Sequence, residues 1–133
     1  MTNTQRIVAA GITGLLVAAC GGSSSSPSNV TPPGNTPQVM TNTITITSAG
    51  ANPRNVQIAL GSRVLFVNDD SRSHNMTSDP HPDHNDCLDL NQVGFLAPGQ
   101  RRETGNLVTA RTCGFHDHDA PSQGLLTGQI VIR

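Results

Sequence analysis

The stretch "GSRVLFVNDDSRSHNM", residues 61–76, decides the fold of this chain. Its opening Gly-Ser pair predicts a turn, and the mostly apolar run over residues 63–68 predicts a buried β-strand. Directly after this run the sequence becomes polar and reaches His74, whose imidazole can bind a metal. The stretch therefore predicts a β protein in which a chemically active side chain follows a core strand.

Other segments of the chain also have the pattern of short strands. Threonine alternates with isoleucine in "TNTITIT" (residues 41–47), and "NVQIAL" (55–60) places its apolar residues, the last of which is Leu60, on one expected buried face. A Pro-Gly turn at 98–99 leads into a further strand, and "GQIVIR" (128–133) is expected to be the last one. No window has the period of an amphipathic helix. Short strands joined by turns predict an all-β sandwich or barrel.

The first twenty residues have the features of an export signal. The lone basic residue Arg6 precedes an apolar run over residues 7–19, which is too short to span a bilayer comfortably and is typical of a signal-peptide core. The run ends in Val-Ala-Ala-Cys at Cys20, which resembles the lipobox of bacterial lipoproteins. That resemblance implies cleavage before Cys20 and a diacylglycerol anchor on its thiol.

This interpretation divides the chain into three parts. Residues 1–19 are the expected signal peptide, and residues 20–41 are a lipid-anchored linker rich in Ser, Pro and Gly that is expected to be disordered. Residues 42–133 are the expected folded domain, which is long enough for a single core. We expect the mature protein to be held by its lipid in a membrane of the cell envelope, facing the periplasm or the cell exterior.

Charge and cysteine content narrow the function. The chain has a net charge of −1 and contains no lysine, so it offers no basic surface for nucleic acid. With Cys20 assigned to lipid, Cys87 and Cys113 remain in a compartment where disulfides persist, which favours one bridge between them. The alternative is that Cys113 is a metal-binding thiolate and Cys87 is a free thiol.

The histidines mark a candidate metal site. The polar stretch over residues 69–91 has no strand pattern and is expected to be a long functional loop. All five histidines of the chain lie in this stretch or close to the end of a later probable strand: His74, His81, His84, His116 and His118. Imidazole suits copper and zinc. His116 and His118 are two positions apart, so in an extended segment both point to the same side. We expect His74, His84, His116 and His118 to be ligands, and His81 to be solvated.

Four motifs, in this order, resemble those of cupredoxins, the plastocyanin-like copper proteins: "GSRVLFVNDDSRSHNM", "LAPGQ", "CGFHDH" and "LLTGQIVI". The resemblance covers roughly residues 43–133 and implies a Greek-key β-sandwich that binds copper as its cofactor. It implies that His74 is the first copper ligand. Cys113 and His116 have the Cys-x-x-His spacing of the family's blue-copper site.

The match departs from the family pattern around His116. No methionine follows this residue, and an alternative alignment places Phe115 near the family's cysteine and His118 at its second histidine. The phrase "SDPHPDH", together with "FHDH", resembles a subgroup of bacterial cupredoxin-like proteins that lack the copper-binding cysteine. Members of that subgroup rely on histidines.

Several functions follow from these interpretations. The favoured one is a lipid-anchored protein, not an enzyme, that binds copper through histidines for delivery or sequestration and works with a redox or copper-delivery partner. The alternative is a blue-copper electron-transfer protein with Cys113 as a thiolate ligand. "GFHDH" also resembles a stretch of copper-zinc superoxide dismutases, but only 15 residues follow His118 and the histidines are too few for that two-metal site. A metal-free interaction module is the plainest alternative.

Overall fold

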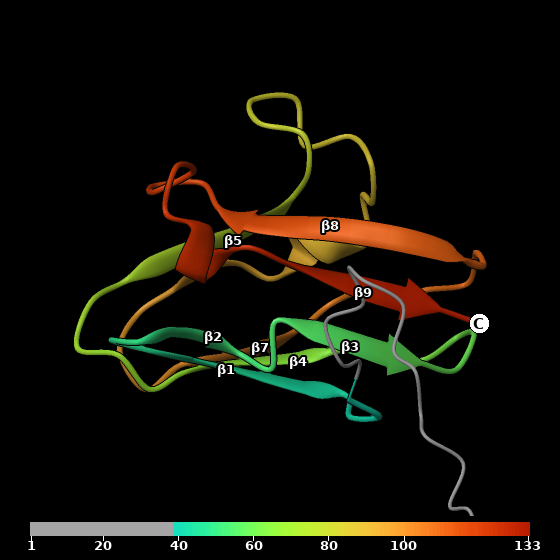
Figure 1. Ribbon diagram of the computed structural model, residues 1–133, viewed down its shortest axis with the longest axis horizontal. Helices are drawn as coiled ribbons and strands as arrows, with labels where there is room; N and C mark the ends of the chain where they lie inside the picture. Colours follow the sequence, from blue (N-terminus) through green and yellow to red (C-terminus); the bar gives the residue numbers. More distant parts are fainter. Residues whose placement is uncertain (1–38) are drawn as a thin grey trace, which may run out of the picture. The chain divides into compact units, whose positions relative to one another are not determined.

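The structure is a computed structural model that describes residues 39–133. These residues form two β-sheets, one of four strands and one of five, joined by short connections (Figure 1). Among them no helix is long and apolar enough to cross a membrane. The expected signal peptide, the anchor at Cys20 and most of the expected linker lie outside the described residues.

The first sheet has the strand order β2-β1-β4-β7. β1 (Thr43–Thr47) runs parallel to β4 (Leu65–Asn68), while β2 (Gly50–Asn52) and β7 (Arg101–Glu103) are antiparallel to their neighbours. β1 alternates between buried isoleucine and half-buried threonine, as its sequence predicts. The expected buried strand is confirmed as β4, whose last three residues are buried.

The second sheet has the strand order β3-β9-β8-β5-β6. Its strands are β3 (Asn55–Ile58), β9 (Gly128–Ile132), β8 (Arg111–Asp117), β5 (His74–Ser78) and β6 (Gly94–Leu96). β3 is parallel to β9, and the other pairs are antiparallel. Two single-turn helices complete the structure, η1 (Leu90–Gln92) and η2 (Gly124–Leu126). The predicted all-β sandwich is confirmed.

The core lies between the two sheets. Phe66 of β4 and Phe115 of β8 are fully buried and meet edge to face, with ring centroids 5.4 Å apart and planes at 89°. Aliphatic side chains from both sheets surround this pair, including Ile44, Ile46 and Ile130. Because the chain has only three phenylalanines and neither tyrosine nor tryptophan, this one contact joins the largest side chains of the core.

The prediction that Leu60 is buried is wrong. β3 ends at Ile58, and the N–H of Ser62 donates to the carbonyl of Ala59 at 3.1 Å, which closes a turn. The chain therefore leaves the sheet before Leu60, whose side chain is 55% exposed.

The prediction of one continuous loop over residues 69–91 is also wrong, because β5 lies within it. The inward-facing residues of β5 are His74, Met76 and Ser78, all of them buried. Since two of these three are polar, the alternation of apolar residues that predicts a strand is missing from the sequence. β5 forms because β8 and β6 supply hydrogen-bonded neighbours on both of its sides.

A disulfide between Cys87 and Cys113 joins the connection after β5 to β8. The two Cα atoms are 5.8 Å apart, and 26 positions separate the cysteines in the sequence. The bridge that the sequence favours is therefore present. Figure 1 shows the connection between β5 and η1 rising on the side of β8 that faces away from the first sheet and then returning past β8 to η1. The disulfide fastens this connection, with its histidines, to the strand that carries His116.

Candidate metal centre

The loop between β5 and η1 is tied to the outer face of the second sheet. The N–H of Asp79 donates to the carbonyl of Gly114 at 3.1 Å, which holds the start of the loop against β8. Within the loop, the N–H of His84 donates to the carbonyl of Pro80 at 2.8 Å and closes a turn. This turn brings His81 and His84 close together over the strand, with ring centroids 5.5 Å apart.

The backbone of His84 is held by two polar side chains. Its carbonyl accepts hydrogen bonds from the Ser78 hydroxyl at 2.9 Å and from the Asn91 amide at 2.7 Å. The amide oxygen of Asn91 in turn accepts from the N–H of Ser78 at 2.8 Å. Among residues 39–133, His84 is the one non-glycine residue with a positive φ, 50°. The left-handed conformation is unfavourable for an L-residue, so these hydrogen bonds hold the His84 backbone in a conformation that the chain alone would not favour.

His116 occupies the outer face of β8. Successive side chains of a strand point to opposite faces, and Phe115 and Asp117 point toward the core. The side chain of His116 therefore points outward, where most strand residues are exposed. It is nevertheless only 3% exposed, because the loop covers it.

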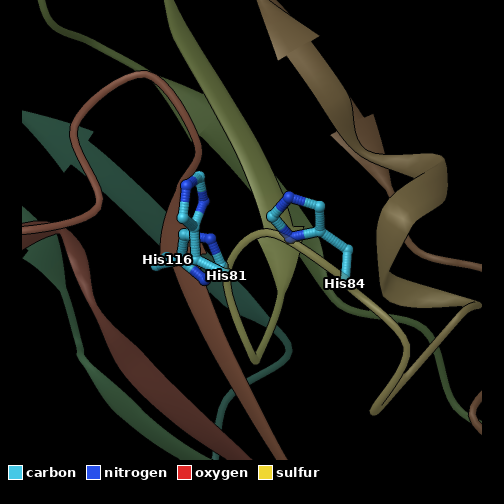
Figure 2. Close-up of side chains that lie close together, drawn as sticks. All are labelled: His81, His84 and His116. Carbon is cyan, nitrogen blue, oxygen red and sulfur yellow. The ribbon is translucent and has the colours of Figure 1, made fainter.

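Four histidines meet between the loop and the strand. Figure 2 shows His81, His84 and His116 close together. Each offers one ring nitrogen, and these three nitrogens lie within 4.8 Å of one another. Directly beyond β8, His118 places its Nδ1 2.8 Å from His84 Nε2 and its ring centroid 5.1 Å from that of His81. A metal ion lies about 2 Å from each imidazole nitrogen, so two ligand nitrogens are at most about 4 Å apart. Small side-chain movements would close this cluster around one ion.

Two of these rings already have the orientation of metal ligands. His84 Nδ1 donates to the carbonyl of Ser78 at 2.9 Å, and His116 Nδ1 lies 2.7 Å from the carboxylate oxygen Oδ1 of Asp79. A carbonyl or carboxylate oxygen only accepts, so each Nδ1 carries the hydrogen and each Nε2 keeps its lone pair. Metal-bound histidines almost always have their second nitrogen held in this way.

The surroundings of His81 favour the neutral form of its imidazole, which is the form that binds metals. Loss of hydration lowers the pKa of His81, and the positive charges of His118, His116 and His84 lower it further. A shared metal ion would remove this repulsion, because it replaces protons between the rings.

No family model matches this sequence, and no curated protein matches it. The structure is similar to a purple cupredoxin from Nitrosopumilus maritimus (20% identity, TM-score 0.53, covering 68% of this chain and 98% of that one). It is also similar to oxidised plastocyanin from Dryopteris crassirhizoma (15% identity, TM-score 0.54, 68% and 99%). A reduced amicyanin mutant has 15% identity and a TM-score of 0.53, covering 68% and 80%. The chain has the cupredoxin fold.

The position of His74 is informative, because the sequence resemblance implies that this residue is the first copper ligand. Its Nδ1 lies 2.8 Å from Asp117 Oδ2, and its Nε2 lies 3.2 Å from Asp70 Oδ2. Both ring nitrogens therefore face carboxylates on the core side of the sheet, whereas His116 lies on the outer side. Of the four expected ligands, the structure brings together His84, His116 and His118 and places His74 apart.

The carboxylates around His74 form a buried ionic network. Burial raises the pKa of Asp70, but hydrogen bonds from Arg72, from His74 and from the N–H of Ser71 outweigh it and lower the pKa to about 2. On the other side, Asp117 Oδ1 accepts from the N–H of Asn75 at 2.9 Å. This network links β5 to β8 directly beneath the histidine cluster.

The cluster includes His81, which the sequence does not indicate as a ligand, and it excludes Cys113, which the sequence offers as an alternative ligand. His81 is exposed, as expected of a solvated side chain, but its ring also faces His84 and His116. The turn that brings it there has no pattern in the sequence beyond two prolines. Cys113 is bonded to Cys87, so its sulfur is part of a disulfide and offers no thiolate to a metal.

Proposed function

We propose that this chain is an extracytoplasmic copper-binding protein that holds one ion between His81, His84, His116 and His118. The observation that carries the proposal is the convergence of three imidazole nitrogens within 4.8 Å, two of them on rings whose Nδ1 is already engaged. Imidazole ligands suit copper. The cupredoxin fold supports the same metal, and one amicyanin structure of this fold is described with Cu(I).

Accessibility of the site supports binding and delivery. His81 is exposed and His118 is half-buried, so a bound ion would be open to a partner protein that accepts it. Blue-copper sites bind the ion through a cysteine thiolate, and Cys113 is held in the disulfide. A histidine site without thiolate lacks the bond that makes those sites strongly coloured. We therefore favour copper delivery or sequestration, without enzymatic activity, over electron transfer through Cys113.

We propose that the protein acts at the cell envelope, because residues 7–19 form the apolar run of an export signal and Cys20 ends a lipobox-like sequence. The disulfide supports this location, because such bonds persist outside a reducing cytoplasm. Mass spectrometry of the chain recovered from cell membranes tests the anchor. A diacylglycerol on Cys20 is expected, and an unmodified thiol there would contradict it.

Titration of the metal-free, disulfide-bonded protein with Cu(II) tests the metal site. We expect one copper per chain and only weak visible absorption, since all ligands are imidazoles. His116→Ala should abolish tight binding, whereas Asn85→Ala, at an exposed position of the same loop, should leave it unchanged. An intense blue or green charge-transfer band would indicate thiolate ligation, and equal binding by both variants would remove the proposed site.

A further inference from the structure

The carboxylate of Asp79 lies beside His116 in a space that depends on Gly114. Residues 114 and 116 are two apart in β8, so both face outward toward the loop. A Cβ atom placed on Gly114 would lie 2.0 Å from Asp79 Oδ2, far closer than two non-bonded atoms approach. The absence of a side chain at Gly114 therefore leaves the room in which the Asp79 carboxylate reaches His116 Nδ1, at 2.7 Å.

We infer that Asp79 is a positioning residue of the metal site, which holds His116 as the Nδ1–H tautomer and directs its Nε2 to the ion. This inference rests on the proposed function. The carboxylate can only accept, so the hydrogen of the neutral ring stays on Nδ1 and the lone pair stays on Nε2, which lies 3.5 Å from the Thr77 hydroxyl. Such a contact also makes the imidazole a stronger ligand, and its loss typically weakens metal binding by about 10- to 100-fold.

The backbone of Asp79 is held independently of its carboxylate. Its N–H donates to the carbonyl of Gly114 at 3.1 Å, and its carbonyl accepts from the N–H of Asp86 at 2.9 Å. A change of the side chain therefore leaves the loop attached to β8. Asp79→Ala consequently tests the carboxylate itself, and Asp83→Ala removes the same charge from an exposed position of the same loop as a matched control.

The first measurement needs no metal. Long-range proton–nitrogen NMR of the metal-free, nitrogen-15-labelled protein reports which ring nitrogen of His116 carries the hydrogen. We expect Nδ1–H in the wild type and in Asp83→Ala, and a shift toward Nε2–H, the form favoured by free histidine, in Asp79→Ala. Asp79→Asn, whose amide oxygen can still accept, should restore the Nδ1–H form. An unchanged tautomer in Asp79→Ala would overturn the inference.

The second measurement is the affinity for Cu(II) alone. Asp79→Ala should bind copper about 10- to 100-fold more weakly than the wild type and Asp83→Ala. Gly114→Ala should weaken binding similarly, because the new methyl group displaces the carboxylate. The two changes should not add in Asp79→Ala/Gly114→Ala, since the second only removes what the first has already lost.

The outcomes separate this inference from the proposed function. A wild-type protein that binds no copper would overturn the proposed function and with it the role of Asp79 toward a metal. A wild type that binds copper, with Asp79→Ala binding equally well, would overturn the inference alone. Additive losses in the double variant would show that Gly114 acts by a route other than the Asp79 carboxylate.

Discussion

Histidine occupies two opposite environments in this chain. His74 has both ring nitrogens against carboxylate oxygens on the core side of the second sheet. His116 meets a carboxylate through Nδ1, while its Nε2 lies 3.5 Å from the Thr77 hydroxyl. The difference arises because Asp117 and His116 are adjacent in β8 and point to opposite faces. One histidine therefore links two strands, while the other is available for a metal.

Acid should weaken the fold through Asp70. Its hydrogen bonds hold the pKa at about 2, below the ordinary value of 3.8. A carboxyl group with a lowered pKa stabilises the folded state above its ordinary value, and this contribution is lost as the pH falls from about 4 toward 2. Asp70→Asn should lower the free energy of unfolding at neutral pH, and its difference from the wild type should shrink toward zero near pH 2. Urea denaturation across this range measures it, and a difference that does not vary with pH would contradict the assigned network.

Replacement of His84 should separate metal binding from backbone conformation. Both His84→Asn and His84→Ala should lose tight copper binding. Asparagine adopts a positive φ more readily than alanine. The free energy of unfolding of His84→Ala should therefore be about 1 kcal/mol lower than that of His84→Asn. Urea denaturation of the two metal-free variants makes this comparison. Equal stabilities would show that the conformation at this position carries no cost.

At the level of elements, local pattern decides which strands can be predicted. β1 alternates in the sequence, β4 is an apolar run and β9 is a short segment rich in β-branched residues, so all three are expected and found. β5 presents histidine and serine to the core, and its partners are distant in the sequence. The strand is paired with β6 and β8, and the buried His74 contacts Asp117 of β8, so no local pattern in the sequence indicates β5.

The disulfide acts between elements, since it joins the loop after β5 to β8. Cys87→Ser/Cys113→Ser should lower the free energy of unfolding by about 3 kcal/mol, mainly by freeing the unfolded chain. It should also weaken copper binding, because His81 and His84 lose a covalent tie to the strand that carries His116. Denaturation and copper titration of the double variant, beside the wild type with and without a reductant, measure both effects. If the folded, reduced protein binds copper as tightly as the disulfide-bonded protein, hydrogen bonds alone hold the loop.

At the level of the whole molecule, the core between the two sheets contains one aromatic pair, Phe66 and Phe115. Phe66→Ala should lower the free energy of unfolding by about 3–5 kcal/mol, because it leaves a cavity beside Phe115. Leu60→Ala is the matched control, since this side chain is mostly exposed, and it should change stability by less than about 0.5 kcal/mol. Thermal unfolding compares the two variants. A large effect at Leu60 would contradict the end of β3 at Ile58.

The sequence by itself determined the all-β class, the core strands with alternating or apolar patterns and the favoured bridge between Cys87 and Cys113. It also indicated which two segments carry the histidines, because composition and short spacing are local properties. The tertiary structure decided which histidines meet. It placed His74 on the core side of the second sheet and assembled His81, His84, His116 and His118 on the outer side. The physical reason is that the face of a side chain depends on strand register and on which loop covers the sheet, and both are set by contacts between residues far apart in the chain.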